Sequence, residues 1–82
     1  MKATVLVRPK GGILDPQGEA VERSLRQLGF EVAQARVGRV IDLEVDAPNA
    51  EEARTQLERM CENLLANPLI ESYEIELEEH GA

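Results

Sequence analysis

The amino-acid sequence predicts one small α+β domain, with two helices packed on one face of an antiparallel sheet in a ferredoxin-like layer. Three observations lead to this prediction. The chain has 82 residues, of which 43% are hydrophobic, which suits a single domain with one core. Three segments alternate apolar and polar residues, and two others repeat apolar residues every three or four positions. Their order along the chain is strand, helix, long strand or hairpin, helix, strand.

The first strand is predicted over residues 2–8, where Ala3, Val5 and Val7 lie on one face and the polar residues Lys2, Thr4 and Arg8 on the other. Pro9 ends the strand, and Lys10, Gly11 and Gly12 form a flexible connection. The run Arg8-Pro9-Lys10-Gly11-Gly12 also pairs glycines with cations, as phosphate-binding loops do. It lacks the Walker spacing, and the helix after it begins at Asp15, which would repel an anion. A strand-to-helix loop is the favoured interpretation.

The first helix is predicted from Pro16 to Leu28. Asp15 can accept hydrogen bonds from the first-turn amides, and proline is preset for the first helical position. Gly29 supplies a left-handed cap at the other end. One stripe of this helix is apolar and is expected to face the core, and it consists of Val21, Leu25 and Leu28 with Ala20 beside it.

The stretch from Glu31 to Asp46 is strand-like but unusually long. Its apolar residues keep the same parity on both sides of Gly38. A two-residue hairpin at Gly38-Arg39 would turn the acidic residues inward, so one long strand bent or bulged at Gly38 fits better. If the strand must bend there, Gly38 is expected to have a positive φ. A three-residue loop centred on Arg39 would also keep the parity, so two separate strands remain open.

The second helix is expected to begin after Asn49, with Glu52 at the capping-box position. Asn67-Pro68 ends it. The last strand alternates again, and Glu79 to Ala82 is expected to be a frayed tail. The helix stripe comprises Ala50, Ala53, Leu57, Met60, Cys61 and Leu64, and the inward residues of the last strand are Tyr73, Ile75 and Leu77.

Composition excludes several classes of function. The formal net charge is −7, and the only aromatic residues are Phe30 and Tyr73, so nucleic-acid binding is disfavoured. No apolar run approaches the ~20 residues that span a bilayer. The first residues alternate like a strand and lack the apolar core of a signal peptide, which indicates a cytoplasmic protein. No disulfide can form within the chain, because Cys61 is its only cysteine.

Residues that could carry chemistry are almost absent from the sequence. Cys61 lies on the apolar helix stripe, and His80, the only histidine, is the third residue from the end. A general base must be held in place, and one cysteine with one histidine cannot make a zinc site. We therefore predict no catalytic, cofactor-binding or metal-binding residue. A homodimer is expected, because the Glu31–Asp46 stretch would span roughly 50 Å if unbroken, about twice the width of such a domain.

Three segments together resemble the PurS component of phosphoribosylformylglycinamidine synthase. They are Leu14-Asp15-Pro16-Gln17-Gly18, then Val37-Gly38-Arg39 leading into Ile41-Asp42-Leu43-Glu44-Val45, then Leu64-Leu65-Ala66-Asn67-Pro68-Leu69-Ile70-Glu71, with Leu28-Gly29-Phe30 between the first two. The residues that define this pattern structurally are Asp15, Pro16, Gly18, Gly29, Gly38, Asn67 and Pro68.

The resemblance implies a homodimeric subunit without catalysis of its own and without a cofactor. It would bridge a PurL-type synthetase and a PurQ-type glutaminase and support the transfer of ammonia in purine biosynthesis. Contacts with these partners are expected in loops, at Arg8, Lys10, Gly11, Gly12 and Asn67. The alternative is a small regulatory module of the ACT type, which would bind an amino acid near Gly11 and Gly12.

Overall fold

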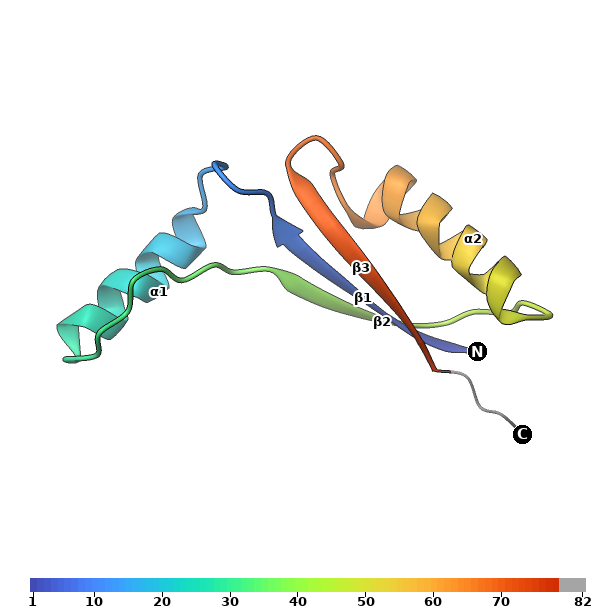
Figure 1. The fold of residues 1–82 in the computed structure, drawn as a ribbon, viewed down its shortest axis with the longest axis horizontal. Helices are drawn as coiled ribbons and strands as arrows, with labels where there is room; N and C mark the ends of the chain where they lie inside the picture. Colours follow the sequence, from blue (N-terminus) through green and yellow to red (C-terminus); the bar gives the residue numbers. More distant parts are fainter. Residues whose placement is uncertain (79–82) are drawn as a thin grey trace.

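A three-stranded antiparallel sheet forms the centre of the molecule, in a computed structural model that describes residues 1–78 (Figure 1). Its strands, in the spatial order β2-β1-β3, are β1 (Lys2–Pro9), β2 (Arg39–Glu44) and β3 (Glu71–Glu78). Val5 of the central strand lies between Ile41 of β2 and Ile75 of β3. This register gathers the alternating apolar residues of the three strands on one face, as the alternation in the first and last strands predicted, while Leu6 and its partner Val40 lie on the opposite face.

Helix α2 (Ala50–Met60) packs on this apolar face. It begins where predicted, because the side chain of Asn49 accepts a hydrogen bond from the amide of Glu52 at 2.9 Å. Leu57 of α2 is fully buried against the sheet. The buried core cluster consists of Ala3, Val5, Val7, Val45, Leu57, Cys61 and Ala66.

The apolar stripe predicted a regular α-helical turn at the end of this helix, but the turn that forms there is wider. Residues Cys61–Leu65 form a single π-helical turn, η1, in which the amide of Ala66 donates to the carbonyl of Cys61 at 3.1 Å. Both residues of that hydrogen bond are buried. The extra residue in the turn therefore keeps Cys61 and Ala66 in the core while Leu64 points outward, 83% exposed.

Helix α1 (Pro16–Gln27) has both of the predicted ends. The side chain of Asp15 accepts from the amide of Gly18 at 3.0 Å. At the other end Gly29 has a φ of 95°, its amide donates to Arg26, and the amide of Phe30 donates to Leu25. This pair of bonds is a Schellman motif, and glycine adopts the left-handed conformation it requires without a Cβ penalty.

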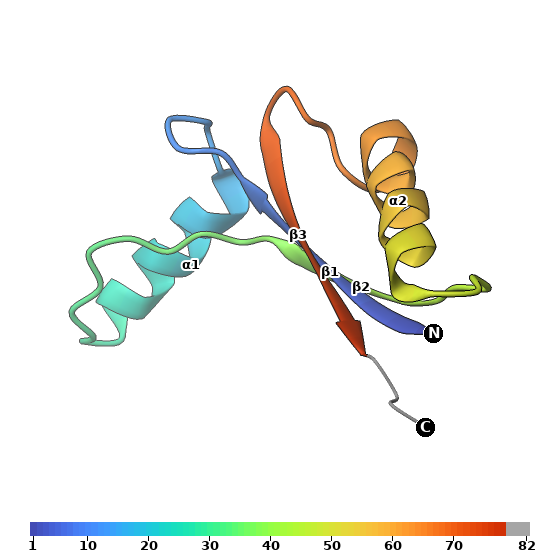
Figure 2. The same ribbon diagram turned by 45° about the vertical axis from the view of Figure 1, so that its right-hand side comes forward.

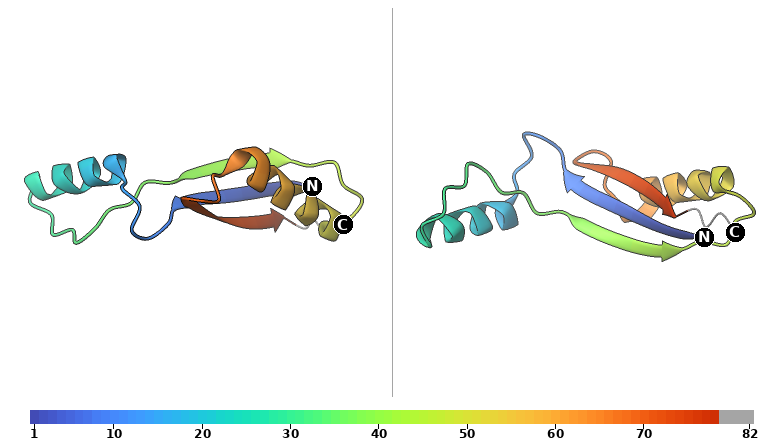
Figure 3. Two further views of the ribbon diagram at one scale, coloured as in Figure 1. Left: turned by 90° about the horizontal axis from the view of Figure 1, so that it is seen from above. Right: turned by 60° about the horizontal axis from the view of Figure 1, so that its bottom comes forward.

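The position of α1 differs from the prediction. The α+β class and the order of the elements are confirmed, but α1 lies beyond the end of the sheet instead of covering its face (Figures 1 and 2). Its apolar stripe is open to solvent in this chain, since Val21 is 42% exposed and Leu28 is 73% exposed. The connections on either side of the helix lead away from the sheet (Figure 3).

The long strand predicted from Glu31 to Asp46 is also shorter in the structure. Only Arg39–Glu44 pairs with β1, and residues 31–38 run alongside α1 without being part of a strand. The positive φ predicted for Gly38 is wrong, because the only described glycines with a positive φ are Gly12 and Gly29. Gly38 is needed for another reason: a Cβ there would overlap the carbonyl oxygen of Val7 on the neighbouring strand.

The chain is much more extended than a compact domain of its length. Its Cα radius of gyration is 16.1 Å, whereas a compact domain of this length is expected to have about 12 Å. The molecule measures 50 × 29 × 14 Å along its principal axes. Within residues 1–78, no helix has both the length and the apolar character needed to cross a membrane.

Candidate partner-binding surface

Two loops meet at the end of the sheet nearest α1, and both contain residues predicted to contact partners. The amide of Lys10 donates to the carbonyl of Ile70 at 2.9 Å, and its ammonium donates to the carbonyl of Pro68 at 2.6 Å. We call the surface formed by Arg8, residues 10–14 and residues 67–70 the loop-end surface. The structure thus brings the predicted contact residues Lys10 and Asn67 to neighbouring loops, although their sequence positions are far apart.

The turn at Asn67 is held by its own hydrogen bonds. The side chain of Asn67 accepts from the amide of Leu69 at 3.2 Å, and its carbonyl accepts from Ile70 and Glu71 at 3.0 and 2.7 Å. Asparagine favours this turn because its side chain can replace a backbone acceptor, and Pro68 restricts the next φ. The loop-end surface therefore has a defined shape on this side.

Arg39 and Glu71 connect this turn to the sheet. The guanidinium of Arg39 donates to both carboxylate oxygens of Glu71, at 2.7 and 3.0 Å, and to the carbonyl of Leu65 at 2.6 Å. The amide of Asn67 donates to the same carboxylate at 2.7 Å. These bonds from Arg39 and then from Asn67 lower the pKa of Glu71, and the bond to Glu71 raises the pKa of Arg39.

Asp15 fixes the other side of the surface. One carboxylate oxygen accepts from Gly18, and the other accepts from the amide of Val37 at 2.9 Å. These two hydrogen bonds, that of Val37 first, lower the pKa of Asp15. Gly18 allows the approach, because a Cβ there would overlap the Asp15 carboxylate and the carbonyl of Ala35. Asp15 is therefore more than a helix cap, since it also ties α1 to residues 31–38.

Large apolar side chains on the loop-end surface face solvent. Leu14 is 72% exposed, Leu69 is 85% exposed and Ile70 is 42% exposed. Lys10, which bonds to the carbonyls of Ile70 and Pro68, is exposed as well, and so is Arg8, although the whole chain carries a net charge of −7. An apolar patch with cations at its rim is typical of a surface that binds another protein.

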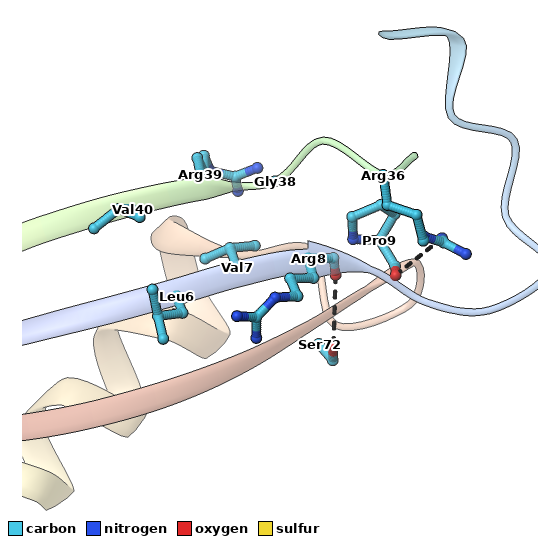
Figure 4. A pocket seen from close by; sticks show the side chains of 9 residues that line it. All are labelled: Leu6, Val7, Arg8, Pro9, Arg36, Gly38, Arg39, Val40 and Ser72. Carbon is cyan, nitrogen blue, oxygen red and sulfur yellow. Dashed lines mark hydrogen bonds between the residues drawn. The ribbon is translucent and has the colours of Figure 1, made fainter. Parts of the chain in front are cut away.

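A shallow hollow of about 470 Å³ lies beside this surface, between β1, β2 and the start of β3 (Figure 4). All three arginines that line it are engaged. Arg8 lies 3.6 Å from the carboxylate of Glu74, Arg36 donates to the carbonyls of Pro9 and Lys10 at 3.0 and 2.8 Å, and Arg39 holds Glu71 as described above. Gly11 and Gly12 do not line the hollow. The geometry therefore supports the strand-to-helix interpretation of residues 8–12 over a phosphate-binding loop.

Cys61 is placed as an apolar core residue. Its side chain is fully buried, and burial, followed by the nearby charges of Glu62 and Glu58, raises the pKa of its thiol. A nucleophilic cysteine needs the opposite shift. Among residues 1–78, no group of three or more His, Cys, Asp and Glu side chains could hold a metal ion. His80 lies outside the described residues.

Sequence reasoning missed several residues in the loop-end surface and beside it. Arg39 and Glu71 were within the segments that carry the family resemblance, but their pairing joins residues that are 32 positions apart. Leu14 and Leu69 were also in those segments. Their position in loops beside Pro16 and Pro68, outside any apolar stripe, was the signal that they could be exposed.

The Arg39–Glu71 pair predicts a pH dependence of stability. A carboxylate whose pKa is lowered by folding stabilises the folded state when the pH lies above the pKa that the group has in the unfolded chain, about 4.3 for glutamate. This stabilisation is lost as the pH falls through the lower pKa that the group has in the folded chain. We expect Glu71→Gln to flatten the loss of unfolding free energy between about pH 5 and pH 2 in urea titrations at fixed protein concentration. Glu76→Gln is the control, because that carboxylate has no ion pair or hydrogen bond among residues 1–78, and it should keep the wild-type slope. Equal slopes for wild type and Glu71→Gln would contradict the prediction.

Comparison with known proteins covers almost the whole chain. Residues 2–79 match the family model described as PurS: phosphoribosylformylglycinamidine (FGAM) synthase. The chain is 41% identical over 78 residues to phosphoribosylformylglycinamidine synthase subunit PurS of Methanocaldococcus jannaschii, covering 94% of both chains. It is 46% identical over 74 residues to the subunit of the same name from Synechocystis, covering 89% of this chain and 72% of that one.

Solved structures agree with this match. The crystal structure of PurS from Methanocaldococcus jannaschii aligns with a TM-score of 0.84 at 40% identity and covers 95% of each chain. A chain in the structure of PurLQS from Thermotoga maritima aligns with a TM-score of 0.84 at 41% identity, covering 92% of this chain and 93% of that one. A match of this length and identity, in sequence and in fold, shows that the chain belongs to the PurS family of phosphoribosylformylglycinamidine synthase subunits.

Proposed function

We propose that this chain is a non-catalytic, cytoplasmic subunit that acts as a homodimer and docks a PurL-type synthetase and a PurQ-type glutaminase to each other. The observation that carries the proposal is the similarity, over nearly the full chain, to a protein in the PurLQS structure from Thermotoga maritima. The proposed role is to support ammonia transfer between two active sites in an ATP- and glutamine-dependent step of purine biosynthesis. The family match disfavours the alternative of an ACT-type regulatory module.

The loop-end surface is our proposed contact with these partners. It combines exposed leucines with lysine and arginine at the rim, and hydrogen bonds between its two loops hold it in one shape. Binding to such a surface loses little conformational entropy, because the loops are already ordered. The extended shape of the chain, with a radius of gyration of 16.1 Å, supports the homodimer. An extended chain buries less of its apolar surface, and a second copy can cover the apolar side chains that stay exposed.

Reconstitution of the synthase tests this function. Purified PurL-type and PurQ-type partners are assayed with and without this chain, using either glutamine or ammonium as the nitrogen donor. Omitting the chain should lower the glutamine-dependent rate by about 100-fold, because docked sites exchange ammonia at a high effective concentration. The ammonium-dependent rate should change little, because free ammonia needs no docking. If the two larger subunits reach the full glutamine-dependent rate alone, the bridging role is wrong.

A further inference from the structure

The turn at residues 67–70 carries apolar side chains that packing does not hold. Leu69 is 85% exposed and Ile70 is 42% exposed. A core side chain is fixed by the residues that it touches, whereas an exposed side chain points where its backbone directs it. The anchors of this backbone therefore decide how this part of the loop-end surface is presented to a partner.

Two cationic side chains anchor the turn to the sheet. Lys10, from the loop after β1, donates through its ammonium to the carbonyl of Pro68. Arg39 is the first residue of β2 and does not belong to the loop-end surface. It bonds to the residues on either side of the turn, Leu65 before it and Glu71 after it.

The guanidinium of Arg39 joins the entry of the turn to its exit. It donates to the carbonyl of Leu65 at 2.6 Å and to the two carboxylate oxygens of Glu71 at 2.7 and 3.0 Å. Leu65 ends η1, where the last helical carbonyls have no partner inside the helix. The Glu71 carboxylate also accepts from the amide of Asn67 at 2.7 Å. One side chain of β2 therefore fixes both ends of the segment that carries the turn.

Arginine suits this position better than lysine does. Its planar guanidinium presents several N–H donors in a fixed fork, so it can bind a carboxylate through two bonds and still reach a carbonyl. The ammonium of lysine is a point charge on a flexible stem. The side chain of Glu71 is 17% exposed, so water screens its bond to Arg39 only in part. The contact is therefore specific in geometry as well as in charge.

We infer that Arg39 is a positioning residue for partner binding, because it holds Leu65 and Glu71 and thereby sets the direction in which Leu69 meets the partner. Arg39 acts through the turn and makes its contacts from β2. The inference rests on the proposed function and on the loop-end surface as the partner contact. It adds a residue that lies outside that surface.

A purely structural role for Arg39 makes a different prediction. If the ion pair only stabilised the sheet, a variant that stays folded would bind the partners as the wild-type chain does. If Arg39 positions the turn, a folded variant binds more weakly, because the loosened turn must be ordered on binding. Once bound, the turn has the same shape, so the rate of the saturated complex does not change.

The test is Arg39→Lys, which keeps the charge, titrated into the reconstituted PurL-type and PurQ-type partners. The concentration that gives half of the maximal glutamine-dependent rate should rise by about 10-fold. The maximal rate at saturating chain should stay within about twofold of wild type. Circular dichroism and urea unfolding confirm that the variant is folded. A titration curve that superimposes on the wild-type curve would overturn the inference.

Arg26→Lys is the matched control. Arg26 also bonds to one carboxylate, that of Glu22 at 2.7 Å, and to the carbonyls of Val32 and Ala33 at 3.0 and 3.1 Å. Its side chain is 53% exposed, against 48% for Arg39. It lies on α1, outside the loop-end surface. This variant should need nearly the wild-type concentration, and equal increases for both lysine variants would count against a role of the turn.

Glu71→Gln breaks the same pair from the other side and decides if Arg39→Lys does not fold. It should raise the half-maximal concentration as well. The variant with both substitutions should bind no more weakly than the weaker single variant, because both changes remove one interaction. Additive losses would mean that the two residues act separately, which contradicts the inference.

Leu69→Ala separates a failure of this inference from a failure of the proposed function. If Leu69→Ala weakens activation and Arg39→Lys does not, the positioning role is wrong and the loop-end contact stands. If Leu69→Ala has no effect, the turn is not the contact, and the positioning role fails while the bridging function stands. If the wild-type chain itself gives no activation, the bridging function is wrong and the inference falls with it.

Discussion

Replacing Gly38 with valine is expected to lower the free energy of unfolding by about 2–4 kcal/mol. The structure gives a specific reason. A Cβ at this position would overlap the carbonyl oxygen of Val7 and would lie 3.3 Å from the Cα of Arg8, so β2 and β1 would have to separate where their pairing begins. Backbone atoms of a central strand cannot move aside as a flexible side chain can.

Urea unfolding at one fixed protein concentration measures this effect, because oligomerisation makes stability depend on concentration. Gly38→Ala should show most of the loss, since the overlap involves the Cβ itself. Gly11→Val is the matched control: a Cβ there meets no atom within 4 Å, and its φ is not positive. That variant should change the unfolding free energy by less than about 0.5 kcal/mol. Near-wild-type stability of Gly38→Ala would refute the close-approach explanation.

The second large effect is expected on partner binding. Reversing two charges of the loop-end surface, as Arg8→Glu with Lys10→Glu, should weaken binding to the synthetase or glutaminase partner by about 10- to 100-fold. The same change should lower the unfolding free energy by less than about 1 kcal/mol, because the ion pair of Arg8 with Glu74 and the hydrogen bond of Lys10 to Pro68 are exposed. Isothermal titration calorimetry at two salt concentrations, with urea unfolding alongside, separates the two effects.

Net charge alone must be controlled for, since the double variant becomes more acidic by four charges. The double variant Arg54→Glu with Arg59→Glu makes the same change on exposed positions of α2, outside the loop-end surface. It should bind the partners with nearly the wild-type affinity. Equal weakening by both double variants would show that general repulsion is responsible, and no weakening by the loop-end variant would place the partner contact elsewhere.

Local features of the fold could be predicted from the sequence because neighbouring residues produce them. Asp15 caps α1, Asn49 caps α2, and Gly29 ends α1 in the left-handed conformation, each within a few residues of the groups it contacts. The alternation in β1 and β3 likewise identified the buried face, because side chains of a strand alternate between its two sides. The function was inferred from the family resemblance, because local patterns of this kind contain no information about it.

Contacts between distant residues were decided only by the tertiary structure. The Arg39–Glu71 pair, the bonds of Lys10 to the turn at Pro68, and the overlap that excludes a Cβ at Gly38 all depend on how the strands are placed. An apolar stripe likewise shows that α1 must be covered, but it does not identify what covers it. Apolar periodicity along the chain identifies the surfaces that need to be buried. The arrangement in space shows that the sheet of the same chain does not bury α1, because the connections of the helix carry it beyond the end of that sheet.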